Sequence, residues 1–247
     1  MKIDATGWVD EAIGIYYGAD SFGRFAQGQP KWLVLHGTAW PAPTGTALNI
    51  ATIWANEVAA GNLGASTHFI IDKVKGFTQG ISLLDTASGN SGAPDSPRDN
   101  YLPAGNLNMY SVSIECCKYD MNDMDELTDY QISILFPLVA AICDFTGIPR
   151  HVWSQADVSK GGIIGHAQCD AKYRSHCPGP MPWKDLQDYL KGSTPMFTNE
   201  RCVTVWNSTG FGKDDAKRSS GIFAFWRDQW VNHKNYMGAP STPEYPW

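Results

Sequence analysis

The chain has 247 residues, of which 43% are hydrophobic and 18% charged, a composition typical of a globular protein that buries a sizeable core. Its formal net charge of -6 argues against a nucleic-acid partner, because a nucleic-acid-binding protein carries a basic face. Six cysteines are too few for a disulfide scaffold.

Short apolar runs and one amphipathic segment make up the first part of the chain. Lys31 to His36, KWLVLH, predicts a buried strand that ends in a histidine. Residues 47–60 place apolar side chains near the helical period and predict a helix. Thr67 to Asp72 predicts a second strand, which a turn at Lys75-Gly76 connects to a hairpin partner at residues 77–83.

The middle of the chain contains a long loop, a strand and a long helix. Residues 85–105 are rich in Gly, Ser, Pro, Asn and Asp and predict a surface loop. Tyr110 to Cys117, YSVSIECC, predicts a third core strand that carries one acid, Glu115. Thr128 to Gln131 fits a capping box, and the helix that it opens runs to about Thr146 and ends at Gly147. Strands with helical connections around them predict an α/β layered fold.

The end of the chain differs from the rest in composition. After a short helix at residues 183–190, Gly192 to Pro195 reads as a linker. Residues 196–247 hold four of the ten tryptophans and carry six basic and five acidic residues, a net charge of +1. We therefore expect a main domain over residues 1–192 and a small aromatic-rich module over residues 196–247.

A cluster of metal-ligand residue types lies between Gly165 and Pro180, GHAQCDAKYRSHCPGP. Zinc binds imidazole and thiolate in tetrahedral geometry, and a catalytic site keeps one position open for water. His166 and Cys177 could supply two ligands, and His36 could supply a third. The alternatives are a disulfide between Cys169 and Cys177 or an ordinary loop, since either histidine taken alone is more simply a hydrogen-bonded core residue.

Several motifs taken in order resemble the zinc-dependent N-acetylmuramoyl-L-alanine amidases, the amidase type 2 group that includes phage endolysins, bacterial cell-wall amidases and peptidoglycan-recognition proteins. WLVLH, STHFIID and SVSIE match three strands of the family. Three further motifs follow in the family's order, Gly147-Ile148-Pro149, Gly165-His166 and Cys177-Pro178-Gly179. The resemblance covers residues 31–190 and implies a mixed central β-sheet flanked by helices.

The resemblance also implies a metal site and a catalytic acid. His36, His166 and Cys177 match the family's zinc ligands, so we expect one Zn²⁺ per chain. Glu115 matches the acid that in many members acts on the zinc-bound water, and a carboxylate there can take a proton and pass it to the leaving amine. The alternatives for Glu115 are an inward salt bridge, since an unpaired buried carboxylate is costly, or a rim position that faces solvent.

One departure from the family concerns positive charge. Ser175 stands where members often carry a lysine that is thought to stabilise the oxyanion. Its hydroxyl can donate a hydrogen bond but brings no charge, so we expect Ser175 to assist catalysis only in part. Lys172 and Arg174 are the candidates to supply the missing charge.

Other departures concern the substrate-binding rim. Thr67 stands where some members place a catalytic tyrosine, and Thr86 to Gly92, TASGNSG, replaces the family's W-H-A-G. We expect Thr67, His68 and Asn90 to contact the substrate, with His68 also able to orient a ligand.

The resemblance implies a peptidoglycan hydrolase that cleaves the amide between the lactyl group of N-acetylmuramic acid and L-alanine of the stem peptide, in peptidoglycan or in muropeptides. The first residues, MKIDATGWVDEA, lack the basic and apolar regions of a Sec signal peptide, and no run approaches the roughly 18 apolar residues of a membrane span. We therefore expect a phage or prophage endolysin, made in the cytoplasm and acting on the cell wall after release, with residues 196–247 as a wall-binding module. The alternatives are a cytoplasmic muropeptide-recycling amidase and a non-catalytic peptidoglycan-binding protein of the same fold.

Overall fold

The computed structural model of the chain describes residues 1–15, 23–42, 44–62, 66–120 and 122–192. The chain divides into two units, Met1–Lys191 and Gly192–Trp247. The module expected at residues 196–247 lies outside the described residues, so its wall-binding role stays a prediction.

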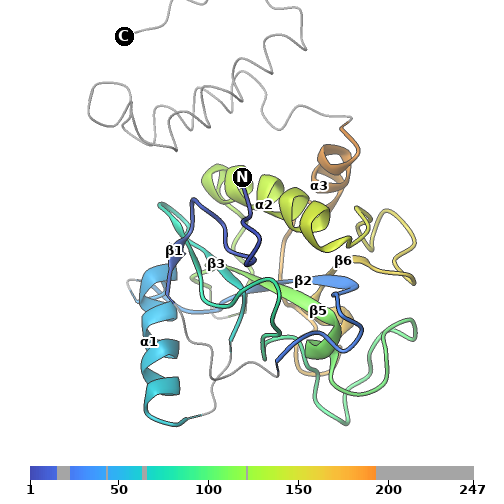
Figure 1. Cartoon of the computed structure of the whole chain (residues 1–247), viewed down its shortest axis with the longest axis horizontal. Helices are drawn as coiled ribbons and strands as arrows, with labels where there is room; N and C mark the ends of the chain where they lie inside the picture. The colour runs from blue at the N-terminus through green and yellow to red at the C-terminus, as the bar shows by residue number, and fades with distance from the viewer. Residues whose placement is uncertain (16–22, 43, 63–65, 121, 193–247) are drawn as a thin grey trace, which may run out of the picture. The chain divides into compact units, whose positions relative to one another are not determined.

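A six-stranded mixed sheet runs through the first unit in the order β1-β4-β3-β5-β2-β6 (Figure 1). Its parallel core consists of β3 (Phe69–Ile71), β5 (Ser111–Cys116), β2 (Trp32–Gly37) and β6 (Gly162–Gly165). At one side β4 (Phe77–Gln79) pairs antiparallel with β3, and the short β1 (Ile13–Gly14) pairs parallel with β4. Because β5, β2 and β6 are parallel, their carboxyl ends meet at one edge of the sheet, where open α/β sheets commonly bind ligands.

Helices cover the two faces of the sheet, with α2 and α3 on one side and α1 on the other (Figure 1). The helix α1 (Ala47–Ala59) packs Ile50 and Ala51 against Ile70 of β3. The predicted capping box is confirmed at α2 (Asp129–Thr146), and the helix ends at Gly147 in the left-handed conformation, with φ 78°. The short α3 (Trp183–Leu190) contacts α2.

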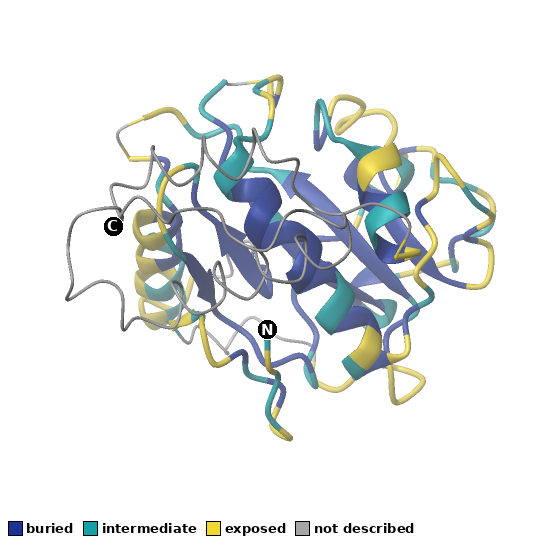
Figure 2. Ribbon diagram, turned by 90° about the horizontal axis from the view of Figure 1, so that it is seen from above, coloured by how far each residue is buried: buried dark blue, intermediate teal, exposed yellow. Residues whose placement is uncertain are grey.

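Among the described residues, α2 is the one helix long and apolar enough to cross a membrane. Its most apolar stretch is 67% buried inside the fold, as is usual for the core helix of a globular protein. Figure 2 shows this buried helix lying across the sheet.

The predicted α/β fold with a mixed central sheet flanked by helices is confirmed, and the predicted hairpin is present with shorter strands than expected. The sequence pattern did not predict β6, since its two isoleucines are bracketed by glycines. Gly162 is needed there because a Cβ at this position would lie 2.5 Å from the carbonyl oxygen of His151, and its φ is 149°. The strand β1 was not predicted either, since it has only two residues and both are exposed.

Candidate active site

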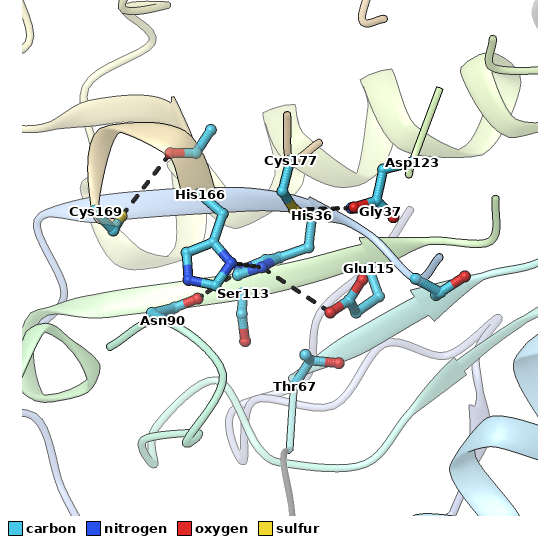
Figure 3. Close-up of polar contacts among 12 residues, drawn as sticks. His36, Gly37, Thr67, Asn90, Ser113, Glu115, Asp123, His166, Cys169 and Cys177 are labelled. Carbon is cyan, nitrogen blue, oxygen red and sulfur yellow. Dashed lines mark hydrogen bonds and ion pairs between the residues drawn. The ribbon is translucent and has the colours of Figure 1, made fainter. Parts of the chain in front are cut away.

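The three predicted metal ligands come together at the carboxyl edge of the sheet. His36 lies at the end of β2, and His166 opens the short 3-10 turn η3 (His166–Gln168) directly after β6. Cys177 lies in the loop before α3. One ligand atom from each residue lies within 4.8 Å of the other two, and all three residues are buried. Figure 3 shows the three side chains directed toward one another.

Hydrogen bonds around Asn90 fix the tautomer of His36. The Ser111 hydroxyl donates to the Leu107 carbonyl at 2.8 Å, so its oxygen accepts from the Asn90 Nδ2 group, also at 2.8 Å. The amide oxygen of Asn90 then faces His36 Nε2 at 2.7 Å and accepts its proton. His36 Nδ1 is therefore unprotonated, and its lone pair points toward His166 Nδ1, 3.0 Å away.

The protonation states of the cluster suit a metal site. Burial is the main cause that lowers the pKa of His36 and brings the pKa of His166 to about 4, so both imidazoles are neutral near pH 7. Burial raises the pKa of the Cys177 thiol, whose sulfur accepts a hydrogen bond from the Gly37 N–H at 3.5 Å. Two neutral imidazoles with converging nitrogens and one thiol form a donor set that zinc prefers, and metal binding would displace the thiol proton.

Glu115 lies directly beside this donor set. It pairs with His36 in the register of β2 and β5, and its Oε1 is 3.9 Å from His36 Nδ1. Its Oε2 is buried without a hydrogen-bond partner among the described residues. Burial, together with the nearby Asp123 carboxyl, raises the pKa of Glu115 to about 8. No lysine or arginine of the described chain lies within ion-pair distance of Glu115. Its one ionisable neighbour at that distance among the described residues is His36, and burial lowers the pKa of His36 so that it is neutral near pH 7. The structure therefore does not support the inward salt bridge.

The three residues expected to contact substrate are buried and have hydrogen-bond partners within the fold. The Thr67 hydroxyl donates to the Phe69 carbonyl at 3.0 Å, and Thr67 is 1% exposed. His68 is fully buried; it accepts from the Ser113 N–H at 3.1 Å, and its Nε2 faces the Asp85 carbonyl at 2.9 Å. Asn90 is fully buried as well and holds His36. These contacts show what the three side chains hold within the fold, and the expected contact of Thr67, His68 and Asn90 with the substrate stays a prediction.

Of the two candidate charged groups, Lys172 and Arg174, it is Arg174 whose positive charge acts on the histidines of the site. Arg174 is exposed, and its positive charge adds to the burial that lowers the pKa of His36 and of His166. Lys172 instead forms an ion pair with Asp95. Ser175 is exposed on the same turn as Arg174, and its expected hydrogen bond to the oxyanion stays a prediction.

The rival metal and disulfide interpretations find no support in the described residues. All five described cysteines are free, so Cys169 and Cys177 do not form a disulfide. His176 is directed toward the carboxylate of Asp123, with Nε2 and Oδ2 3.7 Å apart. His151 is exposed.

Two residues near the site were missed in the sequence, Asp123 and Lys118. Asp123 is buried with Oδ1 unpaired among the described residues, and it has a φ of 60°. Nothing in its polar surroundings, DMNDMDE, marks it as buried. Lys118 is fully buried, and the signal that could have found it is its place directly after an apolar strand.

Comparisons with known proteins identify a family. Residues 26–180 match the sequence profile of a family described as N-acetylmuramoyl-L-alanine amidase, Amidase_2. A search of curated proteins found no significant match.

Several solved structures share the fold. A selenomethionine derivative of AmpD is 21% identical with a TM-score of 0.53, over 77% of this chain and 99% of that one. PlyL is 18% identical with a TM-score of 0.50, over 74% of this chain and 99% of that one. The PlyG catalytic domain is 21% identical with a TM-score of 0.50, over 74% of this chain and 94% of that one.

Proposed function

The chain belongs to the N-acetylmuramoyl-L-alanine amidase family, and from that premise we propose that it hydrolyses the amide between the lactyl group of N-acetylmuramic acid and L-alanine of the peptidoglycan stem. We further propose that His36, His166 and Cys177 hold one zinc ion per chain. The observation that carries the proposal is the convergence of these three ligand atoms within 4.8 Å, next to a carboxylate with a free oxygen.

Zinc bound there would act as a Lewis acid toward the substrate carbonyl and lower the pKa of a water molecule to about 7. The residues of the chain have separate tasks around it. Asn90 keeps His36 in the tautomer that presents Nδ1. Glu115, in the ionised form that a nearby cation favours, accepts the proton of the attacking water through its free Oε2 and returns it to the leaving amine. Arg174 contributes positive charge near the developing oxyanion.

Identification of the cleaved bond tests this proposal. Purified peptidoglycan is digested with the full chain, and the products are identified by mass spectrometry. An amidase releases stem peptides with a free L-alanine amino terminus and leaves the glycan strands intact. Cleavage between two amino acids would indicate a peptidase, and binding to the wall without release of products would indicate a non-catalytic binding protein.

Of the two biological roles, we propose that of an endolysin acting on the intact wall. The support is compositional: residues 196–247 hold four of the ten tryptophans, and aromatic faces can stack on sugar rings. Attachment to an insoluble substrate raises the effective concentration of the enzyme there. The full chain is therefore expected to cleave intact walls faster than soluble muropeptides at equal bond concentration. The opposite preference would indicate a recycling enzyme.

A further inference from the structure

Lys118 follows β5 directly, and its side chain is fully buried. Its Nζ donates hydrogen bonds to two backbone carbonyl oxygens, that of Pro180 at 3.0 Å and that of Asp123 at 3.3 Å. Among the described residues no carboxylate lies within ion-pair distance of this ammonium. Burying a charged group is costly unless it is hydrogen-bonded, so these two hydrogen bonds are what stabilise the buried ammonium of Lys118.

Both carbonyls belong to turns beside the candidate metal site. Pro180 ends the turn that begins at Cys177, and Asp123 has a left-handed backbone with a φ of 60°. The turns touch at Gly179, where a Cβ would lie 1.7 Å from the Asp123 oxygen and 3.2 Å from Lys118 Nζ. A single ammonium therefore joins two turns to the end of a central strand.

The stem of Lys118 also contacts the strand that carries His36. A Cβ on Gly37, the next residue, would lie 2.9 Å from Lys118 Cδ, so the stem passes closely over Gly37. The Gly37 N–H donates to Cys177 Sγ at 3.5 Å. Lys118 thus lies between the strand that presents the first ligand and the turn that presents the third.

We propose that Lys118 is a positioning residue for Cys177: its ammonium fixes the Cys177–Pro180 turn to the sheet and so sets the place of the sulfur relative to His36. This inference rests on the proposed metal site. The backbone of Lys118 is held independently, since its N–H donates to the Thr38 hydroxyl at 3.1 Å and its carbonyl accepts from the Trp40 N–H at 3.0 Å. Loss of the ammonium should therefore release the turn and leave the sheet in place.

The test compares Lys118→Met, which keeps an apolar stem of similar length without donors, with Lys184→Met in the full chain. Lys184 is an exposed residue of α3 and serves as the matched control. Hydrogen-exchange mass spectrometry of the metal-free proteins is expected to show faster exchange in residues 174–182 of Lys118→Met, with β2 and β5 still protected. Competition with a chelator should show zinc binding about 10–100-fold weaker, the range typical when a group that orients a metal ligand from outside the coordination shell is lost. The cobalt-loaded variant should lose thiolate-to-cobalt charge-transfer absorption per bound metal.

Unchanged exchange in the turn, or zinc affinity equal to that of the control, would overturn the proposal. Exchange that rises evenly across the sheet would also overturn it, because Lys118 would then support the whole fold. Lys118→Gln keeps a donor nitrogen with two N–H groups on a shorter stem, so its exchange rate and zinc affinity should lie between those of Lys118→Met and the wild type. Loss of the fold in both variants would make Lys118 a general structural residue. A wild-type chain that binds no zinc would refute the proposed function. The exchange measurement needs no metal, so it would still test whether Lys118 holds the Cys177–Pro180 turn.

Discussion

Replacing Asn90 by alanine tests whether Asn90 holds His36 in the tautomer that carries its proton on Nε2. In the wild type the Asn90 amide oxygen accepts from His36 Nε2 at 2.7 Å and leaves Nδ1 free. Without that acceptor, the metal-free protein is expected to move the proton of His36 to Nδ1, from which it can donate to His166 Nδ1, 3.0 Å away. Zinc would then have to reverse this change before binding.

The burial of His36 sets the expected loss of zinc affinity in Asn90→Ala. Because His36 is 2% exposed, bulk water does not reach its Nε2, and an unsatisfied buried donor costs about 1–3 kcal/mol. Such a cost corresponds to roughly a 10–100-fold loss of zinc affinity, which is also the usual effect of removing an outer partner of a metal ligand.

Competition with a chelator at fixed pH measures the zinc dissociation constant of Asn90→Ala. The matched control is Gln187→Ala, which removes another buried amide, 1% exposed, whose partners are the backbones of Val152 and Arg150. Both variants should lose thermal stability, but only Asn90→Ala should lose zinc affinity. Equal zinc affinity in Asn90→Ala and the wild type would refute the assigned tautomer.

Three further predictions concern single substitutions. Glu115→Gln should keep its zinc and lose activity by about 10²–10⁴-fold, the usual contribution of a general acid–base group, whereas turnover near that of the wild type would make Glu115 structural. Arg174→Gln should lower kcat more than Lys172→Gln, since Lys172 is engaged in a surface ion pair; equal effects in steady-state kinetics would contradict the assigned charge. Gly179→Ala should lose more unfolding free energy in urea than Gly105→Ala, because both have positive φ but only a Cβ at Gly179 would lie 1.7 Å from a backbone oxygen. Similar losses of unfolding free energy in the two alanine variants would mean that the Cys177–Pro180 turn can shift to accommodate the added Cβ.

Long periodic elements and strand-ending residues were predictable from the sequence. The helix α2 was predictable at both ends, since its capping box and terminal glycine have local chemical signatures. His36 and Glu115 each stand near the end of an apolar strand, and the paired register of β2 and β5 brings the two together. The strand β6 was not predictable, because glycines on both sides of two isoleucines hide its pattern.

The partners of the site residues could not be predicted from the sequence. Asn90 lies in a long polar loop, where nothing local shows whether an amide faces solvent or a buried histidine. Lys118 and Asp123 depend on contacts between turns that are distant in sequence, such as the hydrogen bond from Lys118 to Pro180. Periodicity carries no information about such long-range hydrogen bonds.

A zinc titration of amide cleavage tests the central claim most directly. Metal-free full chain is mixed with purified peptidoglycan, and newly released L-alanine amino termini are counted as Zn²⁺ is added. We expect cleavage to be absent without metal and to saturate at one zinc per chain, and His36→Ala to remain inactive throughout the titration. Full cleavage by the metal-free chain, or no new L-alanine termini at any zinc concentration, would contradict the assignment of His36, His166 and Cys177 as the metal centre of an amidase.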